Sequence, residues 1–157
     1  MNQIEHHVRI GQIKTADAGE VLKTVLGSCV GIALIWRRHG KFALAHCLLP
    51  EPLAAERTQE ARYVTQAIPR MLEILGVSKE DISELEAIVA GGGQMMDVEK
   101  PYVKYIVGTE NLRVAKQILE TLKIKIIAFE PGGEQGTKMR LDTSTGDFTV
   151  ERIPRAA

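Results

Sequence analysis

Cys29 and His46 are the two side chains of this sequence whose types and spacing suggest covalent chemistry. A cysteine thiolate is a strong nucleophile, and a neighbouring imidazole activates the thiol by removing its proton or stabilising the thiolate. Such a pair attacks the carbonyl carbon of an amide, an ester or a thioester. The two residues are therefore a candidate site for acyl chemistry, provided that the fold brings their side chains together.

The two residues border apolar segments, 30–36 and 41–48, which predict two strands of one hairpin. With the turn centred in the connection between them, His46 faces Gly31. Cys29 and His46 then leave the same face of the sheet as diagonal neighbours, about 7–8 Å apart at Cα. If the pairing of the two strands shifts by two residues, Cys29 and His46 lie directly opposite each other, again on the same face.

Gly27 and Ser28 precede Cys29, and a glycine there allows a tight bend in which backbone N–H groups approach a bound carbonyl. These N–H groups are candidates for an oxyanion hole. Cys47 points away from His46 in either register, which predicts a buried thiol without a catalytic role. The spacing alone leaves a second interpretation open, in which Cys29 and His46 are also ordinary buried residues of a packed hairpin.

The remaining histidines and glycine clusters give weaker signals. We expect His6 and His7 in a frayed terminus and His39 at a solvated turn. These histidines and the two cysteines lack a recognisable metal-ligand spacing, so we expect no metal. The segments 91–93 and 132–133 match no phosphate-binding or dinucleotide motif, which predicts tight turns and no cofactor.

Composition narrows the class of protein. The chain has 157 residues, 45% of them apolar and 25% charged, which predicts one globular domain over residues 1–157. Lys plus Arg and Asp plus Glu both number 20, and this balance argues against a nucleic-acid partner. A signal-peptide pattern and a membrane-length apolar run are both lacking, so we expect a cytoplasmic protein with reduced thiols and no membrane insertion.

Around the candidate hairpin, the pattern predicts mainly strands. A first helix is expected over 60–75, with Pro69 inside it and Gly76 ending it, and a second over 110–123, capped by Thr109. Further strands are expected over 8–13, 21–26, 85–90 and 124–129, with a last hairpin of 139–142 and 148–153. About seven strands and two long helices predict an α+β fold of antiparallel or mixed strands.

A resemblance to a known family rests first on Leu26-Gly27-Ser28-Cys29-Val30 and Ala45-His46-Cys47-Leu48-Leu49-Pro50. With the histidine at this distance from the cysteine, the sequence resembles the chemoreceptor glutamine deamidase family, CheD. The likeness continues in Arg62-Tyr63, in the segments 88–95 and 107–112, and in Gly132-Gly133, so it covers about residues 8–153. The sequence departs from the usual family pattern at Glu130-Pro131 and at Pro69. These departures concern the rim of the site and the partner surface more than Cys29 and His46.

The resemblance implies an enzyme of bacterial chemotaxis that converts glutamines on the methylation helices of chemoreceptors to glutamates, through a cysteine thioester. It implies a two-sheet, β-sandwich-like core with flanking helices. Cys29 would be the nucleophile and His46 the base, with the backbone of Gly27 and Ser28 at the oxyanion. The family has a third catalytic element, a threonine just before the cysteine, and Thr24 is the candidate for it here.

Two other functions remain open. Members of this family also bind a CheC-type chemotaxis phosphatase, so the alternative is a non-catalytic adaptor. Its binding surface would lie around Lys116, Gln117 and Glu120 or on the terminal hairpin. A cysteine peptidase or acyltransferase would use the same pair of side chains on a different substrate.

Overall fold

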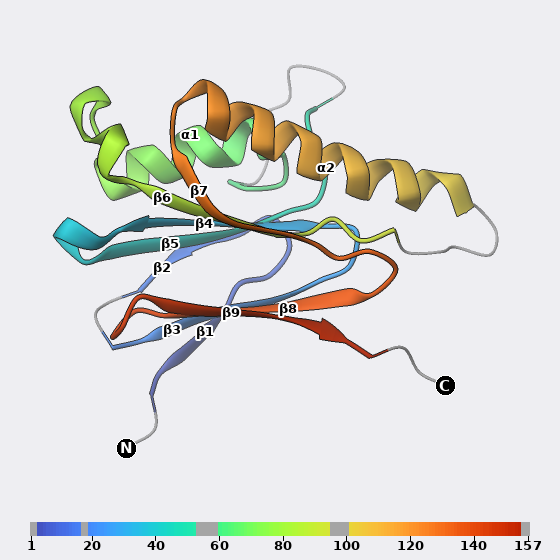
Figure 1. Cartoon of the computed structure of the whole chain (residues 1–157), viewed down its shortest axis with the longest axis horizontal. Helices are drawn as coiled ribbons and strands as arrows, with labels where there is room; N and C mark the ends of the chain where they lie inside the picture. The colour runs from blue at the N-terminus through green and yellow to red at the C-terminus, as the bar shows by residue number, and fades with distance from the viewer. Residues whose placement is uncertain (1–2, 17–18, 53–59, 95–100, 155–157) are drawn as a thin grey trace.

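The computed structural model describes residues 3–16, 19–52, 60–94 and 101–154, without the side chains of residues 101–106. Figure 1 shows two stacked β-sheets, with both α-helices on the outer face of one of them. The result is a three-layer arrangement of helices, a five-stranded sheet and a four-stranded sheet. This arrangement confirms the predicted α+β fold with two sheets of mixed strands.

The five-stranded sheet forms the middle layer. Its order is β2 (Ile13–Thr15), β5 (Lys41–Cys47), β4 (Val30–Trp36), β6 (Glu86–Gly91) and β7 (Lys125–Pro131). Only the β6–β7 pair is parallel. Every residue of the central strand β4 is buried, because helices cover one face of the sheet and the second sheet covers the other.

The four-stranded sheet is the outer layer. Its order is β1 (Glu5–His7), β3 (Val21–Leu26), β8 (Gly136–Asp142) and β9 (Asp147–Ile153), and only the β1–β3 pair is parallel. Exposed and half-buried residues alternate along β9. This alternation is typical of a sheet with one face on the core and the other in water.

The middle sheet has an apolar core on each of its faces. Leu22, Leu26, Leu44, Ile88 and Met139 belong to the core between the two sheets. Ile32, Leu34, Ile68, Met71 and Leu119 belong to the core between the middle sheet and the helices. Each sheet therefore has to keep a defined register, since a one-residue slip would exchange its two faces.

Helix α1 (Val64–Leu75) continues past Pro69 and ends at Gly76, whose φ of 72° is left-handed. A short 3-10 helix, η2 (Lys79–Glu84), follows Ser78, which caps it in a capping box with Asp81. Helix α2 spans Pro101–Thr121. In the described part of the chain, neither helix is long and apolar enough to cross a membrane.

The expected strand over 8–13 is wrong, because the chain changes sheets within it. Glu5–His7 forms β1 in the four-stranded sheet, and Ile13–Thr15 forms β2 in the five-stranded sheet. Between them the chain turns at Gly11, whose φ is 82°. His6 and His7 therefore lie in a paired strand and not in a frayed end, and local patterning misses this because the partner strand β3 is distant in sequence.

Both helix starts also differ from the expectation. Helix α1 begins at Val64, since Tyr63 is extended and bridges to Leu49. Helix α2 begins at Pro101, a residue that suits a first helical position, and Thr109 lies inside it. The short strands β1 and β2 bring the strands of the described residues to nine, where about seven were expected.

Candidate active site

Cys29 lies in the short segment that links the two sheets, between the end of β3 and the start of β4. His46 lies near the end of β5, where the ladder pairs it with Gly31 and pairs Val30 with Cys47. This is the predicted register. Cys29 packs in the core between the sheets and Cys47 in the core under the helices, so the two thiols face opposite ways as expected.

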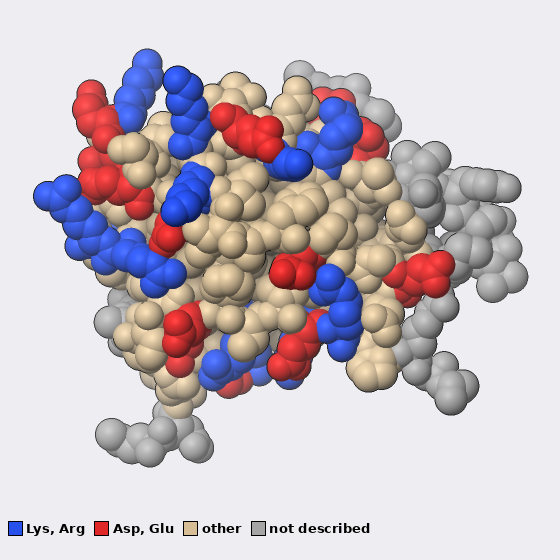
Figure 2. All heavy atoms as spheres, in the orientation of Figure 1, with Lys and Arg blue, Asp and Glu red and all other residues tan. Residues whose placement is uncertain are grey.

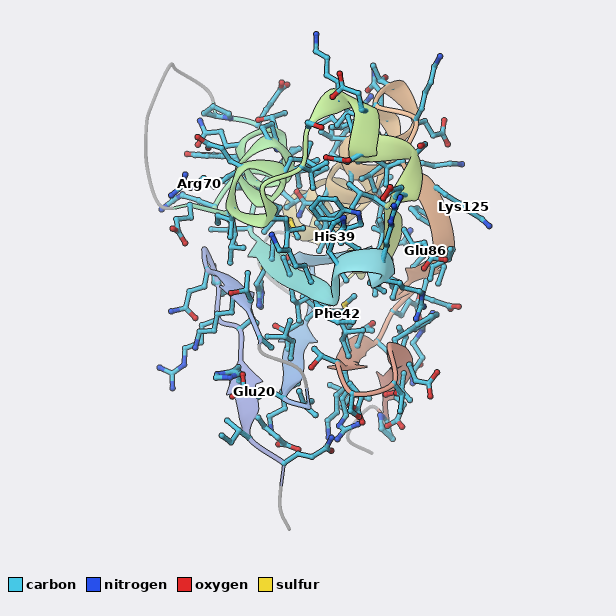
Figure 3. The ribbon with its side chains drawn as sticks, turned by 90° about the vertical axis from the view of Figure 1, so that its left-hand side faces the viewer. Glu20, His39, Phe42, Arg70, Glu86 and Lys125 are labelled. Carbon is cyan, nitrogen blue, oxygen red and sulfur yellow. The ribbon has the colours of Figure 1, made fainter. Side chains whose placement is uncertain are left out.

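Figure 3 looks onto the other end of the hairpin, where the β4–β5 turn carries the labelled His39. His39 is exposed as predicted, and its ring lies 4.0 Å from that of Trp36, centroid to centroid. Phe42, at the same end, belongs to the core between the sheets. The whole length of β4 therefore separates His39 from Cys29.

The imidazole of His46 is held by a residue of the other sheet. Thr24, on β3, places its Oγ1 2.8 Å from Nδ1 of His46 and 2.6 Å from the carbonyl oxygen of Val8. The same carbonyl lies 3.3 Å from Nδ1. All of this is buried, with Thr24 1% and His46 5% exposed. Thr24, which the family resemblance singled out, therefore contacts His46 directly.

The hydrogen bonds of this cluster determine the tautomer of His46. The Val8 carbonyl can only accept, so the Thr24 hydroxyl donates its one proton there. Oγ1 then accepts from Nδ1–H of His46. The opposite assignment would leave two oxygen atoms 2.6 Å apart without a proton between them. His46 therefore carries its proton on Nδ1, and Nε2 is left as the unprotonated, basic nitrogen.

Gly31 allows the core between the two sheets to pack closely beside His46. It lies opposite His46, and a Cβ atom built on it would stand 2.9 Å from Sδ of Met139 and 3.5 Å from Cγ2 of Thr24. Real Cβ atoms do not approach other atoms as closely as the first of these distances. Gly31 could not be selected from the sequence, since one glycine inside an apolar strand carries no chemistry of its own.

Burial keeps both reactive side chains neutral. It raises the pKa of the Cys29 thiol to about 11. It also lowers the pKa of His46, and His7 nearby adds to that lowering while the hydrogen bond with the Val8 carbonyl opposes it. At neutral pH the site therefore holds a thiol and a neutral imidazole. Cys29 has to lose its proton before it can act as a thiolate.

The glycine segment 91–93 packs against the segment that carries Cys29. The N–H of Gly93 donates to the Gly27 carbonyl and the N–H of Gly92 to the Cys29 carbonyl, each at 2.8 Å. A Cβ atom on Gly91 would stand 2.6 Å from the Cys29 carbonyl oxygen. The expected tight turn at 91–93 is thus also a backbone support for the candidate nucleophile, which its local sequence did not indicate.

Asn111, on α2, also contacts this segment. Its Nδ2 donates to the carbonyl oxygens of Ser28, at 3.0 Å, and Leu48, at 3.1 Å. Among the described residues, the N–H groups of Ser28 and Cys29 have no acceptor. Asn111 was not among the candidates predicted from the sequence, where it follows the expected cap at Thr109.

Within the described residues, the other candidates make no hydrogen bond with this cluster, although His7 lies near enough to His46 to help lower its pKa. His6 pairs with Glu20 at 3.0 Å, and His7 is exposed on β1. Nowhere in the described ranges do three His, Cys, Asp or Glu side chains gather as a metal ion would require. Lys116, Gln117 and Glu120 are exposed on α2. Basic and acidic side chains lie beside one another over the face in Figure 2.

The family model and the curated relatives that match this chain agree on one family. A family model described as "CheD chemotactic sensory transduction" matches residues 48–152. A Bdellovibrio bacteriovorus protein named "Probable chemoreceptor glutamine deamidase CheD" is 64% identical over the full length of both chains. A Pyrococcus horikoshii protein of the same name is 36% identical, covering 95% of this chain and 93% of its own.

A Ruegeria relative, "Probable chemoreceptor glutamine deamidase CheD 2", is 32% identical over 96% of this chain and 93% of its own. A solved Neisseria meningitidis structure of another family superposes with a TM-score of 0.47 and 9% identity, over 84% of this chain and 64% of its own. That superposition is too weak to bear on the fold, which rests on the strand pairing described above.

Proposed function

This chain belongs to the CheD family, and on that premise we propose that it is a protein-glutamine deamidase. Its substrates would be glutamines on the methylation helices of chemoreceptors, and its products glutamates and ammonia. The names of its relatives support this substrate class. The single observation that carries the chemistry is the hydrogen bond between Thr24 and His46, which leaves a basic nitrogen in the core that also holds Cys29.

The first half of the reaction forms a thioester. Nε2 of His46 takes the thiol proton while Sγ of Cys29 bonds to the carboxamide carbon of the glutamine. The carbonyl oxygen becomes an oxyanion, which the N–H groups of Ser28 and Cys29 stabilise. The carbon–nitrogen bond then breaks, and the proton on Nε2 goes to the departing nitrogen, which leaves as ammonia.

The second half consumes one water molecule. Nε2 of His46 takes a proton from the water as its oxygen bonds to the thioester carbon. The carbon–sulfur bond breaks, the proton returns to the sulfur, and glutamate and free enzyme remain. Thr24 holds the imidazole in the reactive tautomer throughout, which is the orienting role of the third member of a catalytic triad.

The experiment measures ammonia released from a purified cytoplasmic fragment of a chemoreceptor, with the enzyme kept reduced. We expect Cys29→Ala to abolish release, a loss of about 10⁴-fold or more, because the nucleophile is gone. Cys47→Ala is the matched control and should retain activity within about threefold, since Cys47 faces the helix-side core.

Two outcomes would contradict the proposal. A reduced wild-type enzyme that releases no ammonia from the fragment is not a deamidase of this substrate. Release that continues undiminished in Cys29→Ala would exclude the cysteine nucleophile. A protein that acts only as an adaptor would instead support chemotaxis as well with Cys29→Ala as with Cys29.

A further inference from the structure

Three consecutive carbonyl groups around the candidate nucleophile are each held by a hydrogen bond. The backbone N–H groups of Gly93 and Gly92 hold the carbonyls of Gly27 and Cys29, and Nδ2 of Asn111 holds the carbonyl of Ser28. Asn111 is the one side chain among these three donors. It can therefore be replaced without changing the path of the backbone at the other two.

A held carbonyl also fixes an N–H group, because the peptide unit is planar and its C=O and N–H point in opposite directions. The Ser28 carbonyl shares its peptide plane with the N–H of Cys29. We propose that Asn111 is a positioning residue that aims the Cys29 N–H at the oxyanion of the tetrahedral intermediate, an inference that rests on the proposed function. Donation to the carbonyl also polarises the peptide, which strengthens its N–H as a donor.

The contacts of Asn111 determine which way its amide lies. Both neighbours, the carbonyl oxygens of Ser28 and Leu48, are acceptors, so the nitrogen has to face them. Leu48 follows the strand that carries His46, and one amide group therefore spans the segment of the nucleophile and the strand of the base. The two donors of Nδ2 are both used.

The other end of the same amide argues against a purely structural role. Asn111 is 0% exposed, and among the described atoms its Oδ1 is buried without a hydrogen-bond partner. Such an oxygen is costly to bury, and an apolar side chain of similar size would avoid that cost. The asparagine is therefore explained by what its nitrogen does to the Cys29 segment.

Close packing of α2 seats Asn111 at this place. A Cβ atom on Gly108 would stand 2.5 Å from the Gly93 carbonyl oxygen, so only glycine allows the helix so near. In the same way, Leu112 of α2 leaves no space for a side chain on Gly92. Helix α2 therefore packs directly on the glycine segment 91–93, which is hydrogen-bonded in turn to the Cys29 segment.

The test compares two reactions of the same thiol in Asn111→Leu. Deamidation of the receptor fragment passes through an oxyanion, whereas alkylation of Cys29 by iodoacetamide is a displacement at a methylene carbon and has none. We expect kcat for deamidation to fall about 10- to 100-fold with KM unchanged within about twofold. The rate of Cys29 alkylation should stay within about twofold of wild type.

Gln117→Leu is the control, since it also replaces an amide side chain with leucine, at an exposed position six residues further along α2, and should alter neither rate. Parallel losses of alkylation and deamidation in Asn111→Leu would mean a general loosening of the site and would overturn the inference, as would no loss of either. Wild type that releases no ammonia refutes the proposed function instead. If Asn111→Leu does not fold, Asn111→Ala undergoes the same two assays, with the same expected and contradicting results.

Discussion

The imidazole of His46 is hydrogen-bonded to a threonine that belongs to the other sheet. The Thr24 hydroxyl donates a hydrogen bond to the Val8 carbonyl and accepts one from Nδ1–H of His46, so a single hydroxyl selects the tautomer. The neutral imidazole is then both oriented and basic at Nε2. At the scale of single residues, the activity should depend on this hydroxyl and on the charge of the imidazole.

Replacing the hydroxyl tests its role directly. Thr24→Val keeps the shape of the side chain but leaves Nδ1 of His46 with only the 3.3 Å contact to the Val8 carbonyl. We expect kcat to fall about 10- to 100-fold, and the free energy of unfolding to fall by about 1 kcal/mol. Ammonia release and urea unfolding measure the two quantities.

Thr143→Val is the control for this substitution. Thr143 is also buried, and its Oγ1 donates to the Glu20 carbonyl and accepts from the N–H of Gly19, near the β8–β9 turn. It should lose stability to a similar extent and keep its kcat. If Thr24→Val proved as active as this control, the hydroxyl would have no part in catalysis.

The pH dependence follows from the two neutral groups. Protonation of His46 removes the base, and its pKa lies below 6.5, so kcat/KM should fall on the acid side with a midpoint below pH 6.5. The Cys29 thiol, with a pKa of about 11, imposes no loss on the alkaline side up to about pH 9. A bell-shaped profile with an alkaline midpoint near pH 8 would instead indicate a resting thiolate–imidazolium pair.

The residues of the site differ in how far their positions could be predicted. Cys29 and His46 lie on one local hairpin, whose register follows from the turn and the alternation of faces. Thr24 came only from the family resemblance, because its contact joins two sheets. Asn111 was missed because Thr109-Glu110 resembles a helix cap, and nothing local shows that the helix approaches Ser28.

At the scale of elements, the glycines of segment 91–93 determine how closely α2 approaches the Cys29 segment. They were predicted as turns, which accounts for the φ of 96° at Gly91 and 60° at Gly92. Their second property, close packing, depends on contacts with residues far along the chain. The same limit explains the short strands β1 and β2, whose partners are also distant and whose own patterns are weak.

Gly92 and Gly40 form a matched pair for testing this packing, since both have a φ of 60°. A Cβ atom on Gly40 would meet nothing within 4 Å, whereas one on Gly92 would clash with Leu112 and stand 2.7 Å from the Gly108 carbonyl oxygen. Urea unfolding should show a loss of about 1–2 kcal/mol for Gly40→Ala, the cost of the left-handed backbone alone.

Gly92→Ala should lose that amount and about 1–3 kcal/mol more, because the helix has to shift. Its kcat should also fall, while Gly40→Ala, at the far turn, keeps wild-type activity. Equal effects of the two substitutions on stability and kcat would show that close packing of α2 has no importance for the site.

At the scale of the whole molecule, the candidate site draws on all three layers. Thr24 comes from the four-stranded sheet, His46 from the five-stranded sheet, and Asn111 from the helices (Figure 1). The α+β class could be predicted from the count and patterning of the strands, whereas the two stacked sheets with flanking helices were expected only from the family resemblance. The proposed deamidation depends on that stacking and on one cysteine at the point where the chain passes between the sheets.

Mass spectrometry of a chemoreceptor fragment tests this central claim most directly. With wild-type enzyme in ordinary water, a modified glutamine should gain about one dalton, and in water enriched in oxygen-18 about three daltons, because thioester hydrolysis takes one oxygen from the solvent. Cys29→Ala should give neither shift, while Cys47→Ala should give both. Unmodified glutamines after treatment with the reduced wild-type enzyme, or the same shifts with Cys29→Ala, would contradict the account.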